Sequence, residues 1–392
     1  MKHIISHRAN LFGPNLQTEN QIQTILNAID KNFEVEIDLW FSYNDKKVYL
    51  GHDKPDIEIK EDFLFQYKDK LWIHCKNGEA LSFCLKNKLR CFPHDQDDFT
   101  ITSDQKIWRY PRTKLPYDKD LTIWVMPEYQ NKLIKLDKYH DVLGVCTDFP
   151  YVFQFRLPLS LFSLYQSLEN VYQSIVMKYS KLDKFSYDSS LLFDQNEEKK
   201  CFAAFSFYKP TTELDKLKDE LSNIKNQNHI LYDLTTTKND KFNRGSIGRL
   251  HFTWLQLVSF DNIEKHGLLK DEEIKNLTFN PPINGEKKRR IVFHRVLMVP
   301  SGLILVGYPN FDIYDWRNQY RHFINNKKEK RFSEPYFNDI VHSTIVRWTS
   351  EINKKEIEKY IEMIDKYLPI ELELEKSEDS IQFGYGTYKM CF

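Results

Sequence analysis

KHIISHRANLFGPNLQTEN, residues 2–20, joins an apolar run to a His-Arg pair, a Gly-Pro turn and a Glu-Asn pair. The run at 3–7 predicts a short buried strand, and apolar residues in 22–29 recur at the spacing of one helix face. His7 and Arg8 therefore lie at the end of the first strand, and the turn brings the chain back to that end. Polar side chains at the end of a buried strand indicate a binding or catalytic site.

Short apolar runs alternate with helical patterns through the first 150 residues. Further strands are expected at 33–41, 71–75, 90–92, 106–110, 121–126 and 142–149. Such alternation predicts parallel strands with helical crossovers, in a barrel or an open α/β sheet. Because a full eight-fold barrel needs at least about 200 residues, a barrel over residues 1–155 would be compact and incomplete, with short or missing outer helices.

The pattern changes after residue 155, and a length of 392 residues suits two domains. We expect residues 156–198 to form a connecting helix and linker, and 199–392 to form a two-lobed α+β domain. Each lobe is expected to run strand, helix, strand, and to end in a strand that contains His-x-Thr. The expected elements are strands at 201–208, 249–260, 303–309 and 339–348, with helices near 214–224 and 315–325.

The composition excludes several classes of protein. Lys+Arg and Asp+Glu number 56 each, so no global basic field favours a stable nucleic-acid complex. The six cysteines form no C-x-x-C pair and no zinc-cluster spacing, which predicts reduced and mostly buried thiols. Since the sequence shows no secretory leader and no apolar run of the roughly 20 residues that span a bilayer, we expect a soluble cytoplasmic protein without a membrane partner.

Acidic residues alternate along FEVEIDLW, residues 33–40. In a strand, side chains two apart share a face, so Glu34, Glu36 and Asp38 point the same way. These acids either face solvent at a sheet edge or line a charged site. Two carboxylates, completed by oxygens from substrate and water, are ligands that a hard cation such as Mg²⁺ or Ca²⁺ prefers.

Basic and imidazole groups accompany these acids at successive strand ends. LGHDKP at 50–55 contributes His52, and IHCK places His74 and Lys76 on one face with Cys75 on the other. Barrel enzymes build their active sites at strand ends. In phosphodiester cleavage, a metal with Arg and Lys neutralises charge on phosphorus, while two imidazoles relay protons to and from oxygen. The combined set therefore predicts phosphodiester chemistry.

Five ordered motifs resemble the glycerophosphodiester phosphodiesterase family, which is related to the phosphatidylinositol phospholipase C barrels. They are HR at 7–8, EN at 19–20, EID at 36–38, GHD at 51–53 and GVCTDFP at 144–150. The resemblance covers about the first 150 residues and implies a compact TIM-type barrel. It implies that His7 and His52 are the acid–base pair, that Arg8 and Lys76 bind the substrate phosphate, and that Glu19, Glu36 and Asp38 hold Mg²⁺, Ca²⁺ or Mn²⁺.

The sequence departs from this family at two positions. Ala9 follows His-Arg where the family usually has glycine, a modest change if its φ is negative. His74 stands two residues before Lys76, where a glutamate is usual, so His74 joins the expected metal ligands. Imidazole is softer than carboxylate, which implies a transition metal, weaker Mg²⁺ binding or altered substrates. Glu128, at a later strand end, is a further candidate to face this site.

A second constellation lies in the C-terminal half, in HFTW at 251–254 and HSTI at 342–345. His and Thr two apart share a strand face, so each motif presents one imidazole and one hydroxyl. A partly buried histidine beside a β-former is the structural alternative. The pair resembles the two-histidine phosphoesterases, which include RNA-ligase-like cyclic phosphodiesterases, although Ser343 replaces the usual hydrophobe. This resemblance implies metal-free catalysis on cyclic nucleotide or RNA-end phosphates by His251, Thr253, His342 and Thr344.

The sequence thus predicts a two-domain phosphodiesterase, metal-dependent in its first domain and metal-free in its second. Two alternatives remain open. The chain could be a binding protein for a nucleotide or RNA-end phosphate, with one or both domains inactive, as the substitutions at His74 and Ser343 would allow. It could also hydrolyse lipid-derived glycerophosphodiesters, in line with relatives of the first domain.

Overall fold

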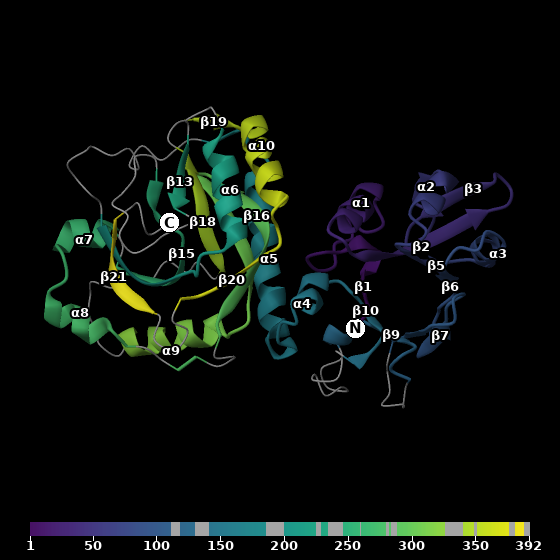
Figure 1. Cartoon of the computed structure of the whole chain (residues 1–392), viewed down its shortest axis with the longest axis horizontal. Coiled ribbons are helices and arrows are strands. Elements are labelled where there is room, and N and C mark those ends of the chain that lie inside the picture. The colour runs from purple at the N-terminus through teal and green to yellow at the C-terminus, as the bar shows by residue number, and fades with distance from the viewer. Residues whose placement is uncertain are drawn as a thin grey trace. The chain divides into compact units, whose positions relative to one another are not determined.

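The chain is a mixed α/β protein that divides into two compact units, Met1–Phe162 and Ser163–Phe392 (Figure 1). The computed structural model describes residues 1–110, 118–129, 141–185, 200–224, 229–233, 246–258, 260–279, 282–283, 288–325, 340–348, 351–375 and 381–387. Each unit has its own sheets and core.

The first unit is built on a ten-stranded sheet whose main strands are parallel. In spatial order these are β6 (Cys91–Phe92), β5 (Leu71–Cys75), β2 (Glu34–Ser42), β1 (His3–Ser6), β10 (Gly144–Thr147), β9 (Thr122–Val125) and β8 (Ile107–Arg109). All of them were expected from the sequence, with ends that agree to within two residues. The antiparallel strands β3 (Lys47–Leu50), β4 (Ile57–Ile59) and β7 (Phe99–Ile101) were not expected.

Few helices accompany this sheet in the described residues. Parallel neighbours need a crossover, and α1 (Ile22–Asp30) joins β1 to β2 while α3 (Gly78–Lys86) joins β5 to β6. Residues 93–106, between β6 and β8, contain β7 and no helix. The remaining helical segments are α2 (Glu61–Gln66), α4 (Pro150–Gln154), η1 (His7–Ala9), η2 (Pro127–Tyr129) and η4 (Leu159–Leu161).

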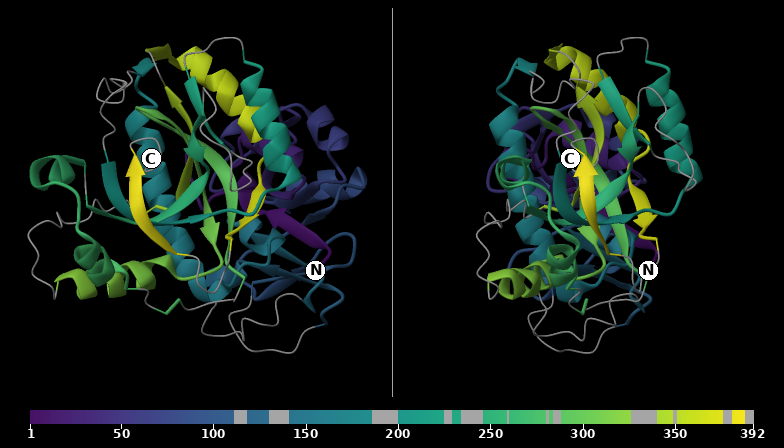
Figure 2. Two further views of the ribbon diagram at one scale, coloured as in Figure 1. Left: turned by 60° about the vertical axis from the view of Figure 1, so that its left-hand side comes forward. Right: turned by 90° about the vertical axis from the view of Figure 1, so that its left-hand side faces the viewer.

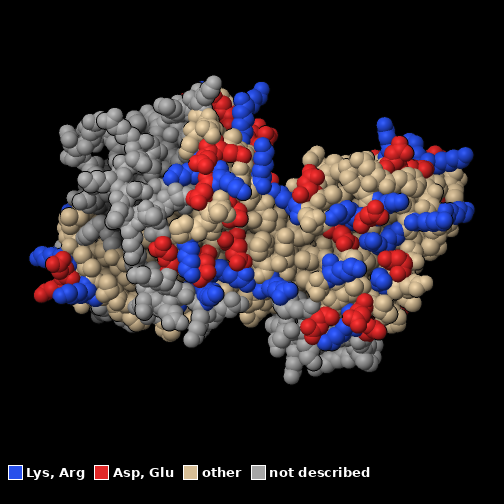
Figure 3. Space-filling view, in the orientation of Figure 1, with Lys and Arg blue, Asp and Glu red and all other residues tan. Residues whose placement is uncertain are grey.

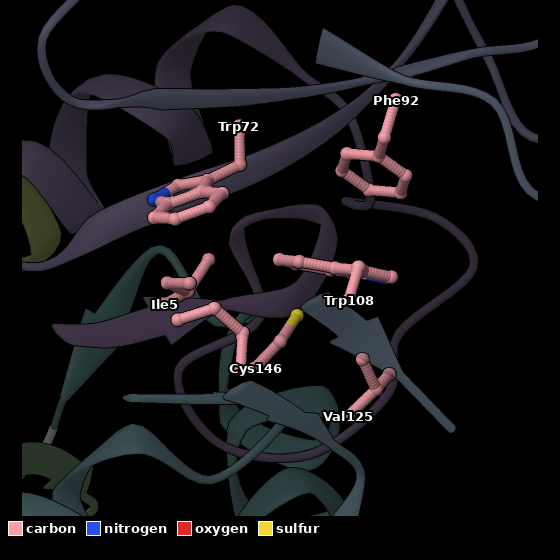
Figure 4. Packing of buried hydrophobic residues seen from close by; sticks show 7 residues of the cluster. Ile5, Trp72, Phe92, Trp108, Val125 and Cys146 are labelled. Atoms are coloured by element: carbon pink, nitrogen blue, oxygen red, sulfur yellow. The ribbon is translucent and has the colours of Figure 1, made fainter. Parts of the chain in front are cut away.

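The parallel strands curve around a shared interior. Inward-facing residues of β1, β5, β6, β8, β9 and β10 meet in one buried cluster, most of which is seen in Figure 4: Ile5, Trp72, Phe92, Trp108, Ile123, Val125 and Cys146. The described strands β6 and β8 do not pair. Instead, Phe92 stacks on Trp108 with ring centroids 4.3 Å apart, and the Ser103 N–H donates to the Cys91 carbonyl over 2.8 Å.

The second unit contains two larger sheets and a short pair. The three-stranded sheet has the order β15 (His251–Val258), β12 (Lys200–Phe207), β21 (Gln382–Thr387). The six-stranded sheet has the order β14 (Ser246–Arg249), β13 (His229–Asp233), β18 (His342–Trp348), β17 (Gly302–Pro309), β16 (Arg290–Val299), β20 (Ile370–Glu373). The short pair consists of β11 (Lys184–Phe185) and β19 (Ile352–Asn353). Each of the two larger sheets therefore carries one His-x-Thr motif, at the start of a strand.

Helices cover these sheets. They are α5 (Phe162–Tyr179), α6 (Thr212–Ser222), α7 (Phe260–His266), α8 (Asp271–Leu277), α9 (Ile313–Asn325) and α10 (Lys354–Asp365). In Figures 1 and 2, α6 and α10 lie side by side, with α10 against β16 and α6 against β13. The expected helices at 214–224 and 315–325 correspond to α6 and α9, whereas α10 was not expected.

Helix α5 belongs to the second unit, although the sequence assigned residues 156–198 to a connector. The Tyr172 hydroxyl lies 2.9 Å from the carbonyl oxygens of both Gly307 and Val341, on β17 and just before β18. Glu169 accepts hydrogen bonds from Arg295 and from the Tyr308 hydroxyl. The helix is thus part of a core, and the expected linker at 186–198 lies outside the described residues.

The described residues show how surface charge is distributed and how apolar the helices are. On the face shown in Figure 3, Lys and Arg are interspersed with Asp and Glu, in keeping with their equal numbers. None of the described helices combines the length and the apolar character that crossing a bilayer requires.

Tyr172→Phe should destabilise the protein by about 1–3 kcal/mol, because two buried carbonyls would lose their hydroxyl partner. The free energy of unfolding from urea titration of the full chain measures this change. Tyr179→Phe, near the end of the same helix, is the matched control and should alter stability by less than about 0.5 kcal/mol. Equal effects of the two substitutions would contradict the placement of α5 in the core.

Candidate metal and phosphate site

A pocket of about 410 Å³ opens in the first unit, where the parallel strands end. The polar residues expected to act on phosphate follow or terminate these strands, which brings side chains distant in sequence to one edge. Of the expected residues, the pocket is lined by His7, Arg8, Glu36, His52, His74 and Lys76.

Three possible metal ligands form the centre of this site. Glu36 and Asp38 are 2% and 0% exposed on β2, so they are not a solvated strand edge. His74 Nδ1 lies 2.9 Å from Asp38 Oδ1 and 3.7 Å from Glu36 Oε1. The donor atoms of all three residues lie within 4.8 Å of one another. The acids on β2 therefore form a charged site together with the anomalous histidine.

Electrostatics make the two carboxylates unequal. Burial opposes the ionisation of Asp38, but the hydrogen bond and charge of His74, with Arg8 and Lys76, outweigh it and lower the pKa of Asp38. Burial, and then the charge of Asp38, raise the pKa of Glu36. Two adjacent buried carboxylates therefore repel each other, and a cation between them would remove this repulsion.

The orientation of His74 suits a metal ligand. Its Nε2 lies 2.9 Å from the His94 carbonyl oxygen, so Nε2 carries hydrogen. A cation that displaces the Nδ1 hydrogen now directed at Asp38 would find the Nδ1 lone pair facing Glu36 and Asp38. Histidines that bind metals commonly donate their other N–H to a carbonyl in this way. The ring is also fixed by stacking on Phe92, with an interplanar angle of 7°. The residues present thus fit a divalent cation.

His7 is oriented by Asp148, a residue that the sequence interpretation missed. His7 Nδ1 lies 2.9 Å from Asp148 Oδ1, which also accepts a hydrogen bond from Asn10. On the other side of the ring, His7 Nε2 lies 4.0 Å from Glu36 Oε2. Burial lowers the pKa of His7, but the hydrogen bond and charge of Asp148, with the charge of Glu36, outweigh it and leave that pKa raised. The signal was a carboxylate directly after a buried strand, in TDFP.

Glu19 lies apart from the group of possible metal ligands. Its Oε2 is 3.1 Å from Arg8 Nη1, and its Oε1 accepts a hydrogen bond from Asn10. The Arg8 Nε lies 3.1 Å from Asp38 Oδ2, so this guanidinium bridges two carboxylates at the wall of the pocket. Lys76 Nζ is 3.5 Å from Asp38 Oδ1. Among the described residues, the geometry pairs Glu19 with Arg8, whereas the family resemblance assigned it to a metal.

The backbone at Ala9 shows that alanine is more than a modest change at this position. Its φ is 65° and that of Arg8 is 49°, so both residues are left-handed and the condition of a negative φ is not met. The turn directs the Arg8 N–H to Glu36 Oε2 over 3.0 Å. A side chain in this conformation costs about 1–2 kcal/mol, which gives a physical reason for glycine at this position in the family.

His52 approaches the pocket from the loop after β3. Its side chain is 42% exposed, and its Nδ1 lies 2.6 Å from Asp53 Oδ1. Nε2 is the nitrogen left for a ligand in the pocket that His52 shares with His7.

Glu128 lies behind this site and is not among the residues that line the pocket. It is 1% exposed, and its Oε1 accepts hydrogen bonds from the Thr147 hydroxyl and from the Asp148 N–H. Burial, together with the charge of Asp148, raises the pKa of Glu128 to about 8 despite the hydrogen bond from Thr147. No described group hydrogen-bonds to Oε2, the position that a proton would occupy.

The structure also brings the two His-x-Thr motifs together. The Ser343 hydroxyl donates to the His251 carbonyl over 2.8 Å, so this serine links the two strands. Burial, the charges of Arg317 and Arg347, and then His251 lower the pKa of His342 to about 3. The guanidinium of Arg347 also lies 3.3 Å from the Thr344 hydroxyl. Thr253, two residues after His251, is partly exposed.

Comparisons of the chain with protein-family models, with curated proteins and with solved structures found no match.

Asp148→Asn should lower the pKa of His7 by about one unit or more, because an opposing charge within about 4–6 Å is removed while burial is retained. An NMR titration of the His7 imidazole measures this shift. Asp141→Asn, at an exposed aspartate of the same unit, should leave the pKa unchanged. If the pKa of His7 is the same in Asp148→Asn and wild type, Asp148 does not hold the imidazole.

Glu128 should make the protein less stable as pH rises. Its pKa is about 8 in the folded chain against an ordinary 4.5, so the folded state binds the extra proton between these values and loses stability across that window. Glu128→Gln removes this loss and should gain on the order of 5 kcal/mol relative to wild type by pH 9, because each pKa unit corresponds to about 1.4 kcal/mol. Urea titrations of both proteins at pH 5, 7 and 9 measure the free energy of unfolding. Exposed Glu61→Gln should follow wild type, and parallel pH curves for Glu128→Gln and wild type would refute the assignment.

Proposed function

We propose that this chain is a two-domain phosphodiesterase. The observation that carries the proposal is the pocket of the first unit, where His7, Arg8 and Lys76 surround the Glu36–Asp38–His74 group. Cationic and imidazole side chains over a possible cation site match the needs of a phosphodiester, which carries one negative charge and requires proton transfer at two oxygens.

The proposed fold of the first unit is a compact, incomplete TIM-type barrel. Three observations support it: the parallel order from β6 to β8, the shared interior cluster, and the site at the carboxyl ends of the strands. For the second unit, the proposal is a two-lobed two-histidine fold, supported by one His-x-Thr strand in each of its larger sheets.

Glu36, Asp38 and His74 would hold the divalent cation of the first unit. When bound, Mg²⁺, Mn²⁺ or Ca²⁺ supplies positive charge at the phosphoryl oxygens and activates an attacking oxygen. Because one of the three ligands is an imidazole, we expect Mn²⁺ to bind more tightly than Mg²⁺ or Ca²⁺.

The other residues of the pocket position the phosphate and move protons. His7, held by Asp148 with a raised pKa, carries the proton that the leaving oxygen needs. His52, on the same pocket, is the second imidazole and accepts the proton of the attacking oxygen. Lys76 and Arg8 direct positive charge toward the phosphate and hold the Asp38 carboxylate in place.

The second unit would act on cyclic nucleotide or RNA-end phosphates without a metal. The low pKa of His342 keeps it neutral at physiological pH but makes it a weak proton acceptor, so its role as general base requires a bound phosphate anion to raise that pKa, and His251 would protonate the leaving oxygen. The hydroxyls of Thr253 and Thr344 would bind phosphate oxygens, and the charge of Arg347 beside Thr344 would attract an anion.

A phosphate-binding protein without turnover is the second candidate for the first unit. It is favoured by the Arg8 guanidinium, which already pairs with Glu19 and Asp38 and so contributes less charge to a transition state. Hydrolysis of lipid-derived glycerophosphodiesters is a narrower form of the main proposal. An activity assay that includes glycerophosphodiesters among its substrates distinguishes these alternatives.

We expect two separable activities when the full chain is assayed on 2′,3′-cyclic nucleotides, cyclic dinucleotides and glycerophosphodiesters. EDTA should abolish one activity, which His7→Ala should reduce by about 10²–10⁴-fold, as for loss of a general acid. The other should resist EDTA and fall by a similar factor in His342→Ala.

The matched controls are His3→Gln, at the start of β1, and His266→Ala, exposed at the end of α7. Each should retain wild-type rates. A wild-type chain that binds phosphodiesters but turns none over with Mg²⁺, Mn²⁺ or Ca²⁺ would support the binding protein instead.

A further inference from the structure

Three buried thiols meet on the far side of β5 from the pocket. Cys75 ends β5, Cys84 lies in α3 and Cys91 starts β6, with exposures of 6%, 0% and 1%. Their sulfur atoms all lie within 4.8 Å of one another. All three are free, as is buried Cys146 on β10, so the sequence expectation of reduced, buried thiols holds for these four. Cys201 and Cys391 lie outside the described side chains.

We propose that Cys75, Cys84 and Cys91 form a binding site for a thiophilic divalent cation, such as Zn²⁺ or Cd²⁺. A cation held by three thiolates at about 2.3 Å places the sulfurs about 4 Å apart. The three sulfurs lie within 4.8 Å of one another, so small side-chain shifts would bring them to this spacing. Soft thiolates select such ions, whereas the oxygen-rich group of Glu36, Asp38 and His74 suits harder ions, so the two sites would take different metals.

A disulfide between Cys75 and Cys91 fits less well than a metal. Ile73 on β5 pairs with Cys91 on β6, so Cys75 lies two residues beyond the register position of Cys91. With about 4.8 Å between strands and about 3.3 Å per residue, the Cα atoms of Cys75 and Cys91 are roughly 8 Å apart. Disulfides rarely bridge Cα atoms more than about 7 Å apart, while a metal between the sulfurs adds the needed reach.

A second pocket gives access to the cluster. It has a volume of about 600 Å³ and is lined by Cys75, so an ion has a route to the sulfurs and water can serve as a fourth ligand. On binding, three S–H bonds break, three metal–sulfur bonds form, and three protons leave to solvent with no change in oxidation state.

A cation at this site would link three secondary-structure elements beside the pocket that His7 and Lys76 line. The cation would join β5, α3 and β6, and Cys75 lies between His74 and Lys76 in the chain. This thiolate site differs in ligands and location from the proposed catalytic cation site. An experiment can therefore disprove one of the two sites and leave the other standing.

Cadmium titration of the reduced, metal-free full chain tests the proposal. We expect one equivalent of Cd²⁺ to produce thiolate-to-metal charge-transfer absorption in the ultraviolet and to release three protons. Carboxylate and imidazole ligands do not give this absorption, so Asp38→Asn should retain it. Cys84→Ala should lose it, whereas Cys146→Ala, the control at a buried thiol outside the cluster, should keep it.

Because Cys84 is fully buried, Cys75→Ala serves as a second variant at the edge of the cluster, and circular dichroism verifies the fold of each. A wild-type chain without thiolate absorption after stoichiometric Cd²⁺ would overturn the proposal. So would folded Cys75→Ala and Cys84→Ala chains that both bind Cd²⁺ with wild-type affinity and absorption.

Discussion

The burial of two adjacent carboxylates on one strand is the constraint on which the first unit depends. Glu36 and Asp38 are almost fully enclosed, and removing a carboxylate from water costs several kcal/mol unless partners compensate. Those partners come from separate segments: Arg8 from the turn after β1, Asn20 from the loop before α1, and His74 from β5. Pairing these two acids therefore fixes the loops that form the pocket.

A buried arginine has a comparable role in the second unit. Arg317 on α9 donates to the carbonyl oxygens of Trp254 and Ile340, which belong to β15 and to the residues before β18. Its charge also contributes to the low pKa of His342. One guanidinium thus joins the segments that carry the two histidines and sets the protonation state of one of them.

Much of the first unit could be predicted because its signals are local. Each parallel strand is a short apolar run, and a side chain's face follows from alternation, so Glu36 and Asp38 were correctly placed on one face of their strand, and the structure shows that this face is buried. The antiparallel strands of this unit were missed, and α5 was expected only as a connecting helix, because their stability comes from partners distant in sequence. For α5, buried Tyr172 contacts carbonyls at 307 and 341, which no local pattern reveals.

The sequence by itself determined which chemical groups stand at the strand ends, because residue type and strand alternation are local properties. Only the tertiary structure decided which of these groups pair. It pairs Asp148 with His7 and Glu19 with Arg8, and it brings together Cys75, Cys84 and Cys91, whose spacing along the sequence does not suggest a zinc cluster. The physical reason is that ion pairs and ligand sets depend on distances of a few ångströms, which strand order and the turns between strands create.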